Sequence, residues 1–314
     1  MGPTTPPPVD RWKLRTRTLT FGRLPRLMGV VNVTPDSFSD GGQFFDPQAA
    51  IDHGLRLAEQ GADLLDVGGE STRPGAEPVS ADEELRRVMP VVAALCEQAA
   101  VPVSIDTSKA AVAREALQAG VEVVNDVTAL GADPAMIPLV AEAGCGVCAM
   151  HMQGTPRSMQ LNPTYDDVVA EMLDYLRARR DALADAGVEP SRIALDPGIG
   201  FGKTTEHNLE LLRNAGRLHE LGCPVLVGHS RKRFIGQLLR DQEADRTPGT
   251  IAVALALARR RVQVLRVHDV GAVRGAMVVF EAAGGVDLDR RHGATYGSGF
   301  YRQAFPPFDR EVDA

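Results

Sequence analysis

The sequence predicts an α/β protein built as a single-domain (β/α)8 barrel of the TIM-barrel type. Eight short apolar segments alternate with segments of helical periodicity along the 314 residues. The apolar segments are rich in Val, Ile and Leu, as expected of parallel strands covered on both faces. Such a barrel usually takes about 250 residues, which fits the chain without its two ends. An open, doubly wound sheet is the alternative, because the number of strands alone does not close a barrel.

The strands are expected at the continuous apolar runs. These runs fall at residues 28–33, 64–67, 101–105, 121–127, 146–151, 193–196, 224–228 and 262–267. Each run is followed by a segment long enough for a helix, as the crossover between parallel strands requires.

Helices are expected where apolar residues recur every three or four positions. These segments are residues 49–60, 85–96, 110–119, 134–143, 164–186, 206–215, 232–239, 250–259 and 270–282. Ser80 and Glu83 form the capping-box pattern before the second helix, which Pro90 is expected to kink.

The two ends of the chain lack this periodicity, so the barrel domain is placed at residues 21–285. The Pro-rich residues 1–20 and the aperiodic residues 286–314 are expected to be disordered. No stretch approaches the roughly 20 apolar residues of a membrane helix, and the N-terminus lacks the apolar segment of a signal peptide. We therefore expect a cytoplasmic protein without a membrane contact. The net charge of −7 also argues against nucleic-acid binding.

Cysteine usage fits the same compartment. Four cysteines in a chain of this length do not suggest a disulfide scaffold, and a reducing cytoplasm fits. Cys145 and Cys148 form a C-x-x-C pattern, but they lie in an apolar strand and not at a helix N-terminus. We expect them to be inert core thiols.

Nearly every predicted strand ends in a polar residue or a polar loop. In a barrel, the carboxyl ends of the strands form the catalytic face. The polar residues there are Asn32, 68–70, Asp106, Asn125, Asp126, His151, Asp196, 230–232, Arg266 and His268. They predict one site at this face, over which the loops at 34–46 and 70–77 are expected to act as lids.

Three of these residues indicate a ligand rich in hydrogen-bond donors. Asp106, Asn125 and Asp196 supply acceptors from three different strands. A buried carboxylate needs a donor-rich partner, or it becomes protonated. An aminopyrimidinone edge, with an exocyclic amine beside a ring N–H, presents two parallel donors to such a carboxylate.

A second group indicates an anion site. Arg266 and His268 are spaced i, i+2 and therefore face the same side of the last strand, and Lys232 adds a third cation. The structural alternative is that Arg266 pairs with a neighbouring carboxylate such as Asp106. Residues 198–204 look like a phosphate-binding P-loop, but the match to that pattern fails by one position.

Eight sequence motifs resemble those of dihydropteroate synthases. In order they are MGVVNVTPDSFSDGG at 28–42, DVGGESTRPG at 66–75, SIDT at 104–107, ND at 125–126, MHMQG at 150–154, DPGIGFGK at 196–203, GHSRK at 228–232 and RVHD at 266–269. The resemblance extends from about residue 27 to about residue 283. It is specific, because the motifs agree in both order and spacing.

The resemblance implies a (β/α)8 fold and a transferase of folate biosynthesis. Such an enzyme condenses 6-hydroxymethyl-7,8-dihydropterin pyrophosphate with p-aminobenzoate to give 7,8-dihydropteroate and pyrophosphate. It also implies a Mg²⁺ cofactor, membership of a family that is the target of sulfonamides, and a homodimer that forms through outer helices.

The resemblance also implies a role for each matching residue. Asp106, Asn125, Asp196, Lys232 and Arg266 would hold the pterin. Asn32, Arg266 and His268 would hold the pyrophosphate, with Asn32 as a Mg²⁺ ligand. Phe38, Thr72, Arg73, Pro74, Phe201 and Lys232 would line the p-aminobenzoate site. The catalytic residues would be Asp40, Lys232 and Asn32, with Asp40 facing the developing cation.

Two departures from the family and three alternatives remain. Residues 259–261 are all arginine where a small residue such as Gly is expected, and Arg233 stands where many members carry Ser. A pterin-dependent methyltransferase would lack the segment 230–232 and the Arg266–His268 pair. A noncatalytic pterin-binding paralogue would show damage at the catalytic positions. A hydrolase with a His229–Ser230 pair is disfavoured, because adjacent strand residues face opposite ways.

Overall fold

The computed structural model describes residues 7–34, 46–73 and 75–286, and within these ranges eight parallel strands form one sheet. They are β3 (Arg26–Asn32), β4 (Leu64–Gly68), β5 (Val103–Asp106), β6 (Val123–Asp126), β7 (Gly146–Met150), β8 (Ile193–Asp196), β9 (Leu226–Gly228) and β10 (Val264–Val267). The last barrel strand, β10, pairs with the first, β3. The remaining gap between β8 and β9 is bridged by Leu195 and Val225, in parallel. The sheet is closed, which confirms the predicted barrel and excludes the open sheet.

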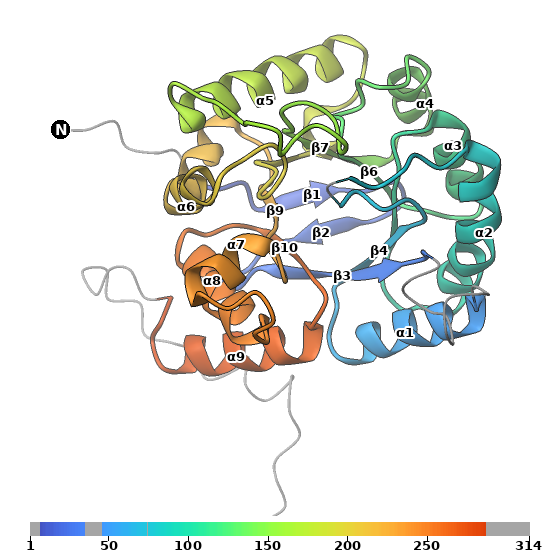
Figure 1. Cartoon of the computed structure of the whole chain (residues 1–314). Coiled ribbons are helices and arrows are strands. Elements are labelled where there is room, and N and C mark those ends of the chain that lie inside the picture. The colour runs from blue at the N-terminus through green and yellow to red at the C-terminus, as the bar shows by residue number, and fades with distance from the viewer. Residues whose placement is uncertain (1–6, 35–45, 74, 287–314) are drawn as a thin grey trace, which may run out of the picture.

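Helices surround the barrel (Figure 1). They are α1 (Pro47–Glu59), α2 (Ala81–Gln98), α3 (Ala110–Gln118), α4 (Met136–Ala143), α5 (Val168–Asp185), α6 (Thr205–Arg213), α7 (Arg233–Leu239), α8 (Thr247–Arg259) and α9 (Val270–Ala282), with 3₁₀ turns η1 (Pro190–Arg192) and η2 (Ala215–Leu221). Ser80 caps α2 by accepting from the Glu83 amide (3.2 Å), but the Glu83 carboxylate pairs with arginines of its own helix. The helix continues through Pro90. Among the described residues, no helix is long and apolar enough to cross a membrane.

Strand residues alternate between two apolar layers, as a period of two requires. Outward-facing residues such as Val31, Leu65 and Val124 pack against the helices in the larger core cluster. Inward-facing residues form the second cluster, which contains Met28, Leu64, Val123, Cys148, Ala194, Leu226 and Val264. Two residues further along four of these strands are the polar residues Asp66, Asn125, Asp196 and Arg266. The barrel interior therefore changes from apolar to polar toward the carboxyl ends of the strands.

The two cysteines of the C-x-x-C pattern belong to the two apolar layers, Cys145 to the outer cluster and Cys148 to the inner one. Both are fully buried and free of disulfides. Burial raises the pKa of the Cys145 thiol to about 12 and that of Cys148 well above its usual range. The prediction of inert core thiols is confirmed.

A β-hairpin closes the amino-terminal end of the barrel. It pairs β1 (Arg11–Lys13) with β2 (Thr18–Thr20). Trp12 and Leu14 are fully buried against the inner cluster, and the Trp12 indole N–H donates to the Arg192 carbonyl oxygen (2.8 Å). The prediction of disorder for residues 1–20 is therefore wrong for 11–20, because these two apolar side chains cover the open end of the barrel. Residues 1–6 and 287–314, where the remaining disorder was expected, lie outside the described residues.

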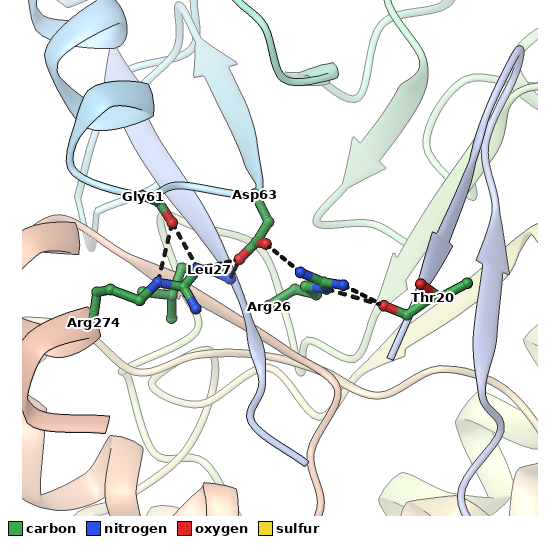
Figure 2. Close-up of polar contacts among 6 residues, drawn as sticks. All are labelled: Thr20, Arg26, Leu27, Gly61, Asp63 and Arg274. Carbon is green, nitrogen blue, oxygen red and sulfur yellow. Dashed lines mark hydrogen bonds and ion pairs between the residues drawn. The ribbon is translucent and has the colours of Figure 1, made fainter. Parts of the chain in front are cut away.

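Asp63, the residue before β4, joins several elements at this same end of the barrel (Figure 2). Its Oδ1 accepts from Arg26 Nη1 (2.8 Å) and its Oδ2 from the Leu27 amide (2.8 Å). Arg274 of α9 pairs with the same carboxylate, and Arg26 Nη2 donates to the Thr20 carbonyl oxygen of β2 (2.8 Å). One carboxylate thus ties the hairpin, β3, β4 and α9 together on the face opposite the predicted site.

Candidate active site

A cavity of about 1200 Å³ opens at the carboxyl ends of the strands. Most of the predicted site residues line it, namely Asn32, Thr72, Arg73, Asp106, Phe201, Lys232, Arg266 and His268. Asn125 and Asp196 are each 5% exposed and lie at the same end of the barrel interior. The structure therefore brings together every predicted site residue that it describes. Phe38, Asp40 and Pro74 lie outside the described residues.

Arg266 forms a charged network across the barrel. Its Nε donates to Asp66 Oδ2 (2.6 Å) and its Nη2 donates to Asp106 Oδ2 (2.8 Å). The Asn125 amide nitrogen donates to the same Asp66 oxygen (3.0 Å). Arg266 thus makes the pairing with Asp106 that the structural alternative expected. Asp66, to which the sequence assigned no role, is the second and more deeply buried partner.

Burial controls the protonation of the carboxylates at this end. It raises the pKa of Asp106, against the opposing effect of Arg266. It also raises the pKa of Asp196, against Lys232 and against the Gly198 amide, which donates to Asp196 Oδ1 (2.7 Å). These carboxylates have lost hydration, so a ligand that brings N–H donors would be favoured there.

The Lys232 side chain lies along the wall of the cavity, beside Phe201. Its ammonium donates to the Ile199 carbonyl oxygen and lies 4.4 Å from the centroid of the Phe201 ring. Gly200 makes this path possible, because a Cβ at that residue would lie 3.0 Å from Lys232 Cδ. Burial lowers the pKa of Lys232 to about 8, while Asp196 opposes this effect. Lys232 therefore lies between the carboxylate end of the site and the aromatic wall.

Lys203 is a buried site residue that the sequence did not reveal. Its ammonium donates to His151 Nδ1 (2.9 Å) and to the Phe201 carbonyl oxygen (2.9 Å). It thereby fixes the loop before α6 against the end of β7. Burial lowers the pKa of Lys203 to about 7 and that of His151 to about 3, so His151 is neutral. In the sequence, Lys203 is part of the rejected P-loop pattern and of the motif at 196–203, but neither pattern assigned it a role.

His268 is neutral as well, which corrects the expectation that it is a cation like Arg266 and Lys232. Burial, followed by the charges of Arg266 and Arg231, lowers its pKa to about 3. The Ser230 hydroxyl accepts from the His268 backbone N–H (3.2 Å) and lies 3.1 Å from His268 Nδ1. With the hydroxyl donating to Nδ1, the ring carries its proton on Nε2. In this tautomer, His268 can donate a hydrogen bond from Nε2 without carrying a charge.

His229 does not pair with its neighbour Ser230. Its Nε2 donates to the Thr250 carbonyl oxygen (3.1 Å), away from the hydroxyl. Burial lowers the pKa of His229 to about 4. The catalytic pair of the hydrolase alternative is therefore not formed.

Comparison with known proteins identifies the family. The family model of pterin binding enzymes matches residues 28–268. The dihydropteroate synthase of Neisseria meningitidis serogroup C is 47% identical over 264 residues, which are 83% of this chain and 93% of that protein. The chain belongs to the dihydropteroate synthase family.

Solved structures of dihydropteroate synthases share the fold. The Xanthomonas albilineans enzyme with 4-aminobenzoic acid gives a TM-score of 0.81 at 49% identity, covering 88% of this chain and 98% of that one. The enzyme from the same organism in complex with 7,8-dihydropteroate gives a TM-score of 0.77 at 46% identity, covering 87% and 98%. The resemblance noted in the motifs is therefore confirmed.

The features that separate dihydropteroate synthases from the methyltransferase alternative lie in the cavity. Ser230, Lys232, Arg266 and His268 all line it. The two departures from the family are also placed by the structure. Arg233 lines the cavity at the first turn of α7. Arg261, near the position where a small residue was expected, has a left-handed backbone with φ of 59°.

Proposed function

We propose that this chain condenses 6-hydroxymethyl-7,8-dihydropterin pyrophosphate with p-aminobenzoate to give 7,8-dihydropteroate and pyrophosphate. The observation that carries the proposal is the polar layer in the barrel mouth, where Asp106, Asn125 and Asp196 lie beside Arg266 and Lys232. Membership of the dihydropteroate synthase family supports it. So do the relatives solved with 4-aminobenzoic acid and with 7,8-dihydropteroate.

The pterin is placed deepest in the barrel. Its exocyclic amine and adjacent ring N–H match the two acceptor oxygens of a carboxylate. Asp196 suits this role, because its Oδ1 is fixed by Gly198 and its Oδ2 lies beside Gly228, which has no side chain to cover it. The Asn125 amide nitrogen already donates to Asp66, which leaves the carbonyl oxygen of Asn125 to accept from the ligand. Asp106 and Lys232 supply the remaining polar contacts.

The pyrophosphate group is placed at Asn32, Arg266 and His268. Arg266 uses two of its five N–H donors on carboxylates, so the others remain for an anion. The His268 Nε2–H adds a neutral donor. Lys232 supplies a positive charge on the same side of the cavity.

We also propose that Asn32 holds Mg²⁺. In the described part of the chain, no cluster of three His, Cys, Asp or Glu residues could hold a metal alone. One amide oxygen at the cavity wall suits an ion that takes its other oxygen ligands from a substrate phosphate and water, as Mg²⁺ commonly does. When bound, Mg²⁺ would neutralise charge on the leaving pyrophosphate.

The p-aminobenzoate is placed against the wall formed by Thr72, Arg73, Phe201 and Lys232. Its aniline-type amine is a weak nucleophile, so catalysis depends on the leaving group. The C–O bond to the pyrophosphate breaks, the C–N bond forms and the amine loses one proton. Asp40 is proposed to face the positive charge that develops on the pterin. Exclusion of water from the cavity protects that cation from hydrolysis.

We further propose that the protein is a homodimer that acts in the cytoplasm. The exposed apolar residues Leu238, Leu239 and Val279 lie on the outer helices α7 and α9, where a second copy would bury them. Light scattering of the purified protein tests this point, since a monomer at micromolar concentration contradicts it.

The test of the function is release of pyrophosphate from the dihydropterin pyrophosphate, measured with and without p-aminobenzoate. We expect release that depends on both p-aminobenzoate and Mg²⁺, together with formation of dihydropteroate. Release without p-aminobenzoate would indicate a hydrolase. Pterin binding without any turnover would indicate the noncatalytic paralogue.

A further inference from the structure

A cluster of three charged residues lies behind the loop that follows β4. The Lys109 ammonium donates to Glu70 Oε2, and also to Glu84 Oε2 (2.5 Å). The three residues come from separate elements: Glu70 follows β4, Glu84 is in α2 and Lys109 precedes α3. Glu70 lies in the polar loop that follows β4 and lines the cavity, but none of the three residues was assigned a role in the site.

Glu84 explains why a lysine is required there. It is fully buried in α2, beneath Gly69. A buried carboxylate is stable only with a charged or donor-rich partner. Burial lowers the pKa of Lys109, but its hydrogen bonds to Glu70 and Glu84 raise that pKa by more, so the ammonium stays charged. The Glu84–Lys109 pair is therefore a fixed anchor to which Glu70 is attached.

Glu70 connects this anchor to both ends of the loop at residues 70–79. Its Oε2 binds Lys109, and its Oε1 accepts from the Val79 amide at the far end of the loop (3.2 Å). The start of the loop is held again by Arg87 of α2, which donates to the Gly69 carbonyl oxygen (3.0 Å). A single carboxylate thus sets the spacing of the loop ends and their position on the barrel.

The loop carries Ser71, Thr72 and Arg73 to the wall of the cavity. We propose that Glu70, anchored by Lys109, is a positioning residue that presents Thr72 and Arg73 to p-aminobenzoate. This inference rests on the proposed function. Although Glu70 lines the same cavity, both of its carboxylate oxygens are engaged by Lys109 and the Val79 amide, so the proposed role is to act through the loop.

The inference predicts a selective kinetic defect. Glu70→Ala removes the attachment of the loop but leaves the Lys109–Glu84 pair balanced, so the fold is expected to survive. The KM for p-aminobenzoate should rise roughly tenfold, while kcat and the KM for the pterin substrate change by less than about twofold. Glu70→Gln keeps an oxygen for the Val79 amide and should show a smaller defect. Glu77→Ala is the matched control, because Glu77 is in the same loop and is exposed.

Hydrogen exchange at the amides of residues 71–79 tests the attachment separately from catalysis. Exchange should be faster in Glu70→Ala than in the wild type and unchanged in Glu77→Ala. Unchanged exchange, or an unaltered KM for p-aminobenzoate in an active enzyme, would overturn the inference. Equal losses for both substrates together with a lower melting temperature would overturn it as well, since they indicate a scaffold role. A wild-type protein that forms no dihydropteroate would instead refute the proposed function.

Discussion

Asp66 determines where the Arg266 guanidinium lies. One of its oxygens accepts from both Arg266 (2.6 Å) and Asn125 (3.0 Å), and its side chain has no exposed surface. A guanidinium bound in this way keeps its direction, and the residues of the proposed pterin site surround it. A search for polar residues at strand ends does not find Asp66, because it lies in the middle of β4.

Asp66→Asn should therefore lower the free energy of unfolding. The amide oxygen can still accept from Arg266 and Asn125, but the negative charge that faces Arg266 is lost, and hydrogen bonds to charged groups contribute roughly 1.5–3 kcal/mol each. Urea denaturation measures the loss, and pterin affinity should fall with it because Arg266 then retains only Asp106 as a charged partner in this network. The control is Asp52→Asn on the surface of α1, where the exposed Asp52 accepts from Gln48 (2.8 Å). Equal stability of the two variants would contradict the role of Asp66.

Buried histidines should make the protein unstable in mild acid. Burial lowers the pKa of His229 to about 4, and those of His151 and His268 to about 3. Below a pH of about 6.5 the unfolded chain binds protons at these positions that the folded protein does not bind until the lower pKa is reached. Stability therefore falls as the pH decreases from 6.5 to 4, by about 1.4 kcal/mol per pH unit for each histidine.

His229→Gln isolates one of these contributions, since the glutamine amide can still donate to the Thr250 carbonyl oxygen. The free energies of unfolding of the variant and the wild type, measured by denaturation between pH 4 and 7, should become more similar as the pH decreases. Parallel curves would show that His229 does not contribute to acid lability.

At the residue scale, the sequence predicted which residues gather at the site better than it predicted their protonation states. The carboxylates, Asn125 and Arg266 were placed correctly at one end of the barrel, because a period of two and the polarity of strand ends determine their positions. The neutrality of His268 could not be foreseen, since it depends on burial and on nearby arginines. The role of Lys203 was not predicted, because only the fold shows that its ammonium contacts His151.

At the scale of elements, the hairpin β1–β2 is the clearest difference from the sequence prediction. A Pro-rich neighbourhood suggested disorder, although residues 11–14 alternate between charged and apolar side chains. That alternation is the signal of a short strand with one buried face. Its partner surface, the open end of the barrel, exists only after the other strands have assembled.

Trp12→Ala should cost about 3–5 kcal/mol of stability, as for other fully buried aromatic residues. The KM values should not change, because the hairpin covers the end opposite the cavity. Denaturation and steady-state kinetics on the same variant test both parts. Leu19→Ala, on the neighbouring strand and only half-buried, should cost less. A stability equal to that of the wild type would contradict the closing role of the hairpin.

The turn before β10 carries strain that can be relieved. Arg261 has a left-handed backbone, which costs a non-glycine residue about 1–2 kcal/mol. Arg261→Gly removes this cost but adds backbone entropy to the unfolded chain, for a net gain of about 0.5–1 kcal/mol. The melting temperature should rise by about 2–4 °C per kcal/mol, with activity unchanged. Arg260→Gly, whose φ is −89° and whose side chain donates to Arg213, should lower it. A lower melting temperature for Arg261→Gly would refute the strain.

At the scale of the whole molecule, the two ends of the barrel have different roles. The amino-terminal end is closed by the hairpin and tied by Asp63, whereas the carboxyl end holds the cavity and the charged network. The fold was predictable because eight apolar runs are separated by helices, but closure itself depends on the pairing of β10 with β3 and of Leu195 with Val225. Those contacts are long-range and leave no local pattern in the sequence.

The most direct test of the central claim is calorimetric titration of a dihydropterin into wild-type protein and into Asp196→Asn. The claim is that the polar layer at the carboxyl end is the pterin site. The amide would turn a donor toward the donors of the pterin, so affinity should fall by about 10- to 150-fold, the equivalent of roughly 1.5–3 kcal/mol. Asp63→Asn is the matched control at the opposite end and should lose stability but not affinity. Equal dihydropterin affinity in the wild type and in Asp196→Asn would contradict the account.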